Sequence, residues 1–147
     1  GGVRPNVLPA EATAMINYRF HPRDTAADIL ARARAEVAGL EGVDVDWAEP
    51  PREATPMSST TSTSYALLAA LSREILPDAP VAPGLVLAGT DSRNYSDVAE
   101  NVYRFQPMLF TAEDLEGIHG TNEHLTLANM ERTIRFYIGL MEAGAMQ

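Results

Sequence analysis

A chain of 147 residues with 20 acidic and 11 basic side chains carries a formal net charge of −9 at pH 7. This balance argues against a nucleic-acid-binding protein, which normally presents a basic surface to the phosphate backbone. The sequence has no cysteine, so disulfides and thiolate metal sites are excluded, and any metal must be held by His, Asp and Glu. No apolar run is long enough for a transmembrane helix, and no secretion signal is expected in the first residues.

The N-terminal third of the chain predicts a strand, a helix and a second strand. Apolar and polar side chains alternate over 12–20, as in a strand with one buried face. A helix capped by Asp24 or Thr25 is predicted to follow and to stop at Gly39. Alternation over 43–47 predicts the second strand. The helix is expected to bury an apolar stripe formed by Ile29, Leu30, Ala33, Val37 and Leu40.

A change of composition then divides the chain. Residues 49–64 are rich in Pro, Ser and Thr and have almost no hydrophobic period. They are expected to form an extended connector, although a surface loop fits the same composition. The sequence thus predicts a first unit over 1–48 and a second over 65–147.

The second unit is predicted to begin with a helix that Pro77 ends. Two short strands are expected, over 84–89 and 102–108, and a long helix capped by Thr126 closes the chain. The faces expected to turn inward carry Leu67, Leu68, Leu71 and Ile75 on the first helix, and Leu127, Met130, Ile134, Tyr137, Ile138 and Met141 on the last. This order of elements favours an α/β or mixed α+β fold.

One histidine lies in a stretch that fits neither helix nor strand. His119 stands between two glycines in "GIHGTNEHL", where the backbone is free to bend. Such an imidazole could bind a metal or transfer a proton, or it could be a loop histidine without a role. Glu123 and His124 are candidates for a second shell that orients its ring.

A second polar cluster follows the strand predicted over 84–89. The sequence "GTDSRNY" presents Asp91 and Arg93 at the end of that strand, a position where ligands are commonly bound. Arg93 could bind a carboxylate with two parallel hydrogen bonds. A local salt bridge between Asp91 and Arg93 in a turn is the alternative.

Two further polar residues lie near the N-terminus. The carboxamide of Asn6 could donate to an oxyanion, or Asn6 could simply be a turn residue. Arg19 could contact a substrate, or it could occupy the outward face that the alternation over 12–20 predicts.

Taken in order, "GGVRPNVLPAEATAMINYRFHP", "GTDSRNY" and "GIHGTNEHL" resemble the C-terminal part of the co-catalytic zinc aminoacylase and carboxypeptidase superfamily. The branch of carboxypeptidase S and the N-fatty-acyl-amino-acid hydrolases is the most similar. The resemblance implies that residues 1–48 are part of a lid domain used for dimerisation, and that 65–147 belong to a catalytic domain with two bridged metal ions. It therefore implies a homodimer, a small-molecule substrate with a free carboxylate, and zinc as cofactor.

The resemblance also assigns residues. It makes His119 a metal ligand, Arg93 the receptor of the substrate carboxylate, and Asn6 and Arg19 lid residues near the scissile carbonyl and the carboxylate. The other metal ligands and the general base of the family lie upstream of the matching motifs. The expected function is therefore that of a C-terminal portion of a hydrolase of N-acyl amino acids or small peptides, inactive alone. The alternative is a non-catalytic module that oligomerises through a lid-like strand edge.

Overall fold

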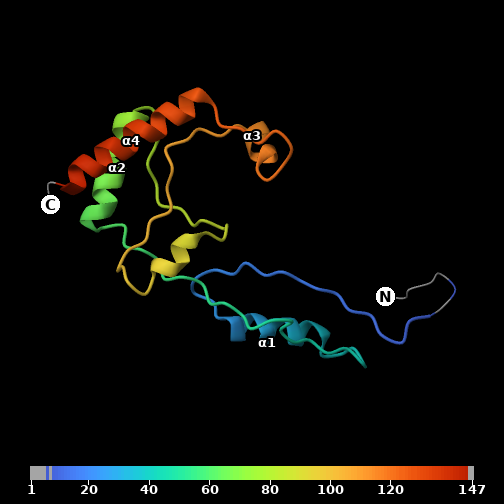
Figure 1. Ribbon diagram of the computed structural model, residues 1–147. Helices are drawn as coiled ribbons and strands as arrows, with labels where there is room; N and C mark the ends of the chain where they lie inside the picture. Colours follow the sequence, from blue (N-terminus) through green and yellow to red (C-terminus); the bar gives the residue numbers. More distant parts are fainter. Residues whose placement is uncertain (1–5, 7, 146–147) are drawn as a thin grey trace. The chain divides into compact units, whose positions relative to one another are not determined.

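The computed structural model describes Asn6 and residues 8–145, which divide into two compact units, Gly1–Met57 and Ser58–Gln147. The division after Met57 falls inside the segment 49–64. None of the helices among the described residues has both the length and the apolar composition that a bilayer crossing requires. In chain order (Figure 1), the elements are α1 (Ala26–Val37), α2 (Thr63–Ile75), the 3-10 helix η1 (Asp91–Tyr95), α3 (Ala112–Gly117) and α4 (Leu127–Ala145).

The predicted α/β fold is wrong, because no strand forms within the described part of the chain. The segments expected as strands, 12–20, 43–47, 84–89 and 102–108, have neither helix nor strand assignment there. Alternating side chains specify two faces, but a strand also needs a second segment whose backbone pairs with it. Among the described residues there is therefore also no strand edge of the kind on which the alternative, an oligomerising module, depended.

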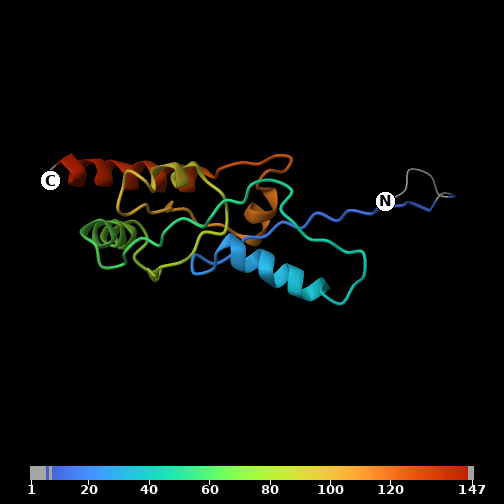
Figure 2. The same cartoon turned by 90° about the horizontal axis from the view of Figure 1, so that it is seen from below.

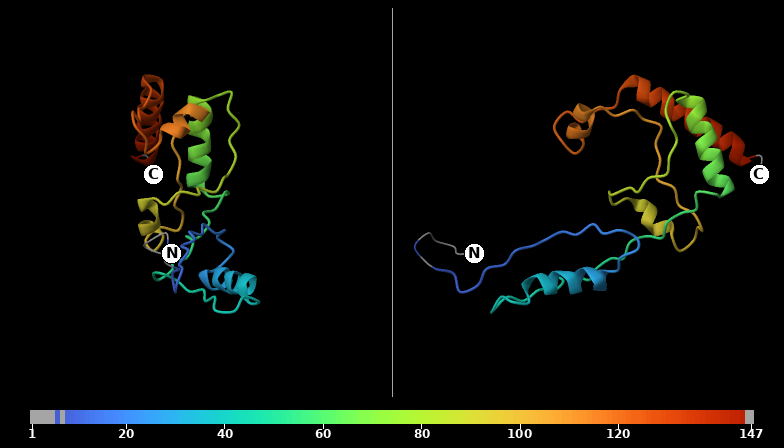
Figure 3. Two further views of the ribbon diagram at one scale, coloured as in Figure 1. Left: turned by 90° about the vertical axis from the view of Figure 1, so that its right-hand side faces the viewer. Right: turned by 180° about the vertical axis from the view of Figure 1, so that it is seen from behind.

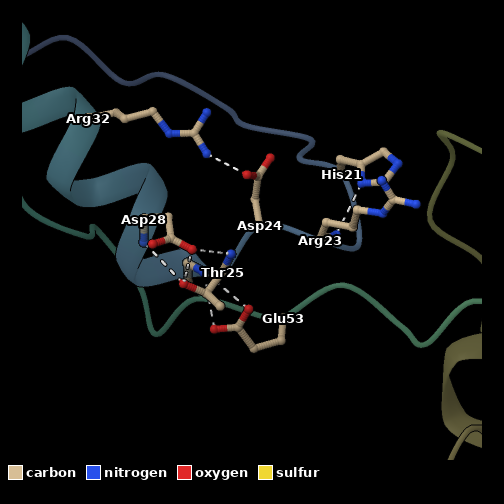
Figure 4. A network of polar contacts seen from close by, with 8 residues as sticks. His21, Arg23, Asp24, Thr25, Asp28, Arg32 and Glu53 are labelled. Carbon is tan, nitrogen blue, oxygen red and sulfur yellow. Dashed lines mark hydrogen bonds and ion pairs between the residues drawn. The ribbon is translucent and has the colours of Figure 1, made fainter.

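The first unit is built on α1, whose N-terminus is closed by a capping box. Thr25 is the N-cap, and its hydroxyl accepts a hydrogen bond from the backbone N–H of Asp28 at 3.2 Å. In return the Asp28 carboxylate accepts from the backbone N–H of Thr25 at 2.9 Å and from its hydroxyl at 2.6 Å. Both carboxylate oxygens of Glu53 accept from the N–H of Ala26, at 3.2 and 3.1 Å (Figure 4). These contacts satisfy donors that a helix start leaves without a partner.

The chain that follows α1 returns along it, which is visible in Figure 3. Arg34 Nε donates to the carbonyl oxygen of Val45 at 2.9 Å, and Arg34 also lies 3.6 Å from the Asp46 carboxylate. Of the stripe predicted to turn inward on α1, Ile29 is buried and Leu40 is exposed. The helix ends at Val37, before Gly39.

The second unit is organised by α2 and α4, which pack against each other (Figure 2). Ser62 caps α2 by accepting from the backbone N–H of Tyr65 at 3.0 Å. At the crossing, a methyl group built on Gly139 would lie 2.9 Å from Leu71 Cδ2, so the helices approach closely there. Phe136, 1% exposed, is among the most completely buried side chains of the unit, and its ring centroid lies 5.3 Å from that of Phe105.

The face of α4 that was predicted to be buried is exposed. Asn129 and Phe136 are the buried residues of this helix, and both lie opposite the predicted stripe. The stripe residues are each between 41% and 88% exposed: Leu127, Met130, Ile134, Tyr137, Ile138 and Met141. The spacing of apolar residues showed that α4 has an apolar face, but it did not show which face of the helix packs against the rest of the unit.

Candidate functional site

His119 lies in the loop that follows α3 and has an unusual backbone conformation. Its φ is 62°, in the left-handed region that few residues other than glycine adopt. The N–H of Gly120 donates to the carbonyl oxygen of Gly117 at 2.9 Å, closing the turn. A Cβ at position 120 would come within 3.1 Å of that same oxygen, so glycine allows this close approach. The turn leaves His119 exposed to solvent.

Glu123 contacts the backbone of His119. Its carboxylate accepts a hydrogen bond from the His119 N–H at 3.2 Å, and this contact supports the left-handed turn. The orientation of the imidazole by Glu123 stays a prediction. The neighbouring His124 uses its Nδ1 locally, at 2.9 Å from the carbonyl oxygen of Asn122, another residue with positive φ.

The helix that leads into this loop begins with a second capping box. The Asp114 carboxylate accepts from the backbone N–H of Thr111 at 2.7 Å and from its hydroxyl at 2.8 Å. These hydrogen bonds, the backbone one first, lower the pKa of Asp114 below its ordinary value, and the charge of His124 acts in the same direction. The Asp114 carboxylate in the first turn of α3 is therefore ionised at neutral pH, and it stabilises the helix that precedes the His119 loop.

Arg93 occupies the middle of η1. Its backbone N–H donates to the carbonyl oxygen of Thr90 at 3.3 Å, and its own carbonyl oxygen accepts from the hydroxyl of Ser96 at 2.6 Å. The side chain of Arg93 is half-buried, whereas Asp91 at the start of the same turn is exposed. The main chain of Arg93 is thus hydrogen-bonded on both sides in a short helical turn, where the sequence predicted a strand end and a loop.

The first unit carries the other two predicted substrate residues. Asn6 is an exposed turn residue, and Arg19 is exposed in the extended chain that precedes α1. Arg19 borders a hollow of about 430 Å³ together with Tyr18, Phe20, His21, Asp24, Ile29, Arg32, Ala33 and Glu36. Figure 4 shows part of its polar wall, where Asp24 pairs with Arg32 at 2.6 Å and His21 Nδ1 accepts from the backbone N–H of Arg23 at 3.1 Å.

The metal site that the resemblance implies is not complete in these residues. Within Asn6 and residues 8–145, no group of three or more His, Cys, Asp or Glu side chains could hold a metal ion. A zinc site in a protein has at least three protein ligands, and His119 supplies one imidazole. The described residues therefore do not fit a zinc ion by themselves.

Several side chains that hold η1 and the extended chain over 102–109 were not identified from the sequence. Arg104, in the stretch predicted as a strand over 102–108, donates from Nε to the hydroxyl of Ser92 in η1. Ser58 is hydrogen-bonded to the backbone of Val102 in the same stretch, and Asn129 to the backbone of Leu109 just after it. Their side-chain-to-backbone pairing joins residues 20 and 44 positions apart, and no local spacing signals it.

Comparison with known proteins decides the family. The model of peptidase family M20/M25/M40 matches residues 3–143 of the chain. The chain belongs to this peptidase family. Its membership confirms the resemblance that the three motifs indicated, with the carboxypeptidase S-like and N-fatty-acyl-amino-acid hydrolase proteins among its relatives.

Three curated relatives illustrate the likeness. A probable carboxypeptidase S-like 2 from Dictyostelium discoideum is 38% identical over 96% of the chain, and the match covers 27% of that relative. The N-fatty-acyl-amino acid synthase/hydrolase PM20D1 of Xenopus tropicalis is 32% identical, again over 96% of the chain and 27% of the relative. Carboxypeptidase S of Saccharomyces cerevisiae is 23% identical over 92% of the chain and 29% of the relative. The chain thus spans little more than a quarter of their length, and no solved structure matches it.

Proposed function

We propose that residues 1–147 contribute a substrate-binding region to a hydrolase that cleaves the amide bond of N-acyl amino acids or small peptides. Membership of the M20 family supports this reaction class, as do relatives named carboxypeptidase and N-fatty-acyl-amino acid hydrolase. Since the chain spans about 27% of these relatives, the rest of the catalytic apparatus is proposed to lie on polypeptide outside these residues.

Arg93 is proposed to bind the free carboxylate of the substrate. The observation that supports this role is its half-buried position in η1, with its main chain hydrogen-bonded to Thr90 on one side and Ser96 on the other. A planar guanidinium can form two parallel hydrogen bonds to a carboxylate. Asp91, in the same turn, is proposed to contact the substrate as well.

Two residues of the first unit, which is proposed to be part of a lid domain, are also proposed to contact the substrate. Arg19 would assist in holding the carboxylate, and the carboxamide of Asn6 would donate to the oxyanion that forms at the scissile carbonyl. The exposure of both side chains is compatible with contact to a small molecule. We also propose that the polypeptide is a homodimer formed through this unit, whose exposed apolar side chains, such as Met15 at 83% and Ile16 at 68%, are surface that a partner would cover.

His119 is proposed to be one of several metal ligands, with zinc as the metal. This role is supported by the position of His119 on a tight, exposed turn, where its backbone N–H is hydrogen-bonded to Glu123. The remaining ligands would come from outside the described residues, because these residues contain no cluster of three possible ligands.

The test is an assay of the full-length polypeptide that contains residues 1–147. N-acyl amino acids and matched N-acyl amino acid amides are offered at equal concentration, with and without prior dialysis against a chelator. Hydrolysis of the carboxylate substrates, with little turnover of the amides, is expected, and chelation is expected to abolish it. Equal turnover of both substrate types would contradict the proposed carboxylate recognition.

A further inference from the structure

An extended segment beside η1 is fixed near both of its ends by side chains that pair with its backbone. The hydroxyl of Ser58 donates to the carbonyl oxygen of Val102 at 2.9 Å and accepts from the N–H of the same residue at 2.8 Å. At the other end the carboxamide of Asn129 accepts from the N–H of Leu109 at 3.0 Å and donates to its carbonyl oxygen at 2.9 Å. Each side chain thus provides the donor and acceptor that a neighbouring strand would otherwise provide.

Both anchors belong to the second unit. Asn129 is 3% exposed and belongs to α4, and its Oδ1 also accepts from Arg132 at 2.9 Å. Near Val102, the hydroxyl of Tyr103 donates to the carbonyl oxygen of Ser59 at 2.6 Å. The segment between Val102 and Leu109 is therefore a fixed support.

Arg104 projects from this support to η1. Its half-buried side chain donates from Nε to the hydroxyl of Ser92, which is also hydrogen-bonded to the hydroxyl of Thr90. Ser92 immediately precedes Arg93 in the chain. The contact therefore ties the turn that carries Arg93 to a segment that is held by Ser58 and by Asn129 of α4.

The turn needs such a contact because it is weak by itself. η1 has five residues, and the backbone hydrogen bonds at Arg93 and Ser96 are long, at 3.3 and 3.4 Å. Short 3-10 helices have poorer hydrogen-bond geometry than α-helices, so tertiary contacts decide their position. A charged donor such as a guanidinium forms a stronger hydrogen bond than a neutral one.

We propose that Arg104 is a positioning residue that acts through Ser92 and holds η1 so that Arg93 is in place for a substrate carboxylate. This inference rests on the proposed carboxylate role of Arg93 for its catalytic consequence. Its structural part, the dependence of η1 on the contact between Arg104 and Ser92, is independent of that role.

The experiment compares four variants of the full-length polypeptide: Arg104→Gln, Ser92→Ala, the double variant, and Ser92→Thr, which keeps the hydroxyl. Amide hydrogen exchange at Arg93 and Ser96 is expected to be roughly 10-fold faster in the first two, because one charge-assisted hydrogen bond is lost. The effect of the double variant is expected to be smaller than the sum of the two single effects, since both single variants remove the contact between Arg104 and Ser92. Ser92→Thr should exchange as wild type does. Arg135→Gln is the control, because Arg135 is 63% exposed on α4.

Kinetics provides the second readout. KM for an N-acyl amino acid is expected to rise roughly 10-fold in Arg104→Gln and Ser92→Ala, with KM for the matching amide unchanged. Unchanged exchange at η1 would overturn the inference, as would exchange that accelerates equally in α2 and α4. If wild type hydrolyses neither substrate, the proposed function fails, and exchange at η1 alone decides whether Arg104 positions the turn.

Discussion

His119 has a φ of 62°, and this conformation limits which substitutions can test it. Alanine is strained in the left-handed region, so His119→Ala would change the loop as well as remove the imidazole. Asparagine tolerates positive φ and is a poor zinc ligand. His119→Asn therefore isolates the contribution of the ring, while the hydrogen bond from its backbone to Glu123 can stay.

We expect residues 1–147 to bind zinc weakly or not at all, because a zinc site needs three protein ligands and the described residues contain no such cluster. Isothermal titration calorimetry with zinc at neutral pH measures this. A stoichiometric, submicromolar site that disappears in His119→Asn would contradict the account.

A second prediction concerns the carboxylate that caps α1. The hydroxyl of Thr25, and then its backbone N–H, lower the pKa of Asp28 below the ordinary value of 3.8. Because the folded pKa is the lower one, the contribution of this cap to stability is complete above about pH 3.8 and is lost as the pH falls through the folded pKa. Thr25→Ala removes the strongest donor and should move the pKa of Asp28 back toward 3.8, measured by NMR titration of the carboxyl carbon. An unchanged pKa of Asp28 in this variant would show that the capping box has no such effect.

At the scale of elements, the packing of α4 on α2 depends on a glycine. A methyl group at Gly139 would lie 2.9 Å from Leu71 Cδ2, whereas one at Gly144 in the same helix would meet nothing within 4 Å. The two glycines therefore form a matched pair, one at the helix crossing and one away from it.

Gly144→Ala should raise the free energy of unfolding by up to about 1 kcal/mol, because alanine favours a helix over glycine. Gly139→Ala gains helix propensity as well, but Leu71 Cδ2 at the end of its side chain must move, and this offsets part of the gain. It should therefore be less stable than Gly144→Ala. Urea unfolding measures both, and equal stability would show that the helices do not approach closely at this point.

The elements also show what the sequence could and could not predict. Helix starts were predictable because Thr25 and Thr126 are local capping signals, and both hydroxyls accept from the N–H three residues on. Strands were not, because pairing depends on partners far along the chain, and side chains such as Asn129 pair with the backbone of 102–109 instead. The buried face of α4 was mispredicted because α2 packs on the side of the helix that carries Gly139, where the absence of a side chain allows close approach. The apolar stripe gives no information about this contact.

At the scale of the whole molecule, the motifs were more informative than the periodicity. The order of the segments around Asn6, Arg93 and His119 indicated the family, and the match over residues 3–143 shows it. Conformational detail such as the 3-10 turn at Arg93 or the positive φ of His119 depends on hydrogen bonds that no motif specifies. The assignment of 1–48 to a lid and 65–147 to a catalytic domain stays a prediction.

The central claim is that Arg93 binds the carboxylate of the substrate, and Arg93→Lys in the full-length polypeptide tests it most directly. Lysine keeps the charge but loses the planar, bidentate geometry. The variant should lower kcat/KM for N-acyl amino acids by roughly 10- to 100-fold, equivalent to about 1.4–2.7 kcal/mol. The matched amides should be poor substrates for wild type and nearly insensitive to the substitution. An equal loss of activity toward carboxylate and amide substrates would show that Arg93 maintains the turn and does not recognise the carboxylate.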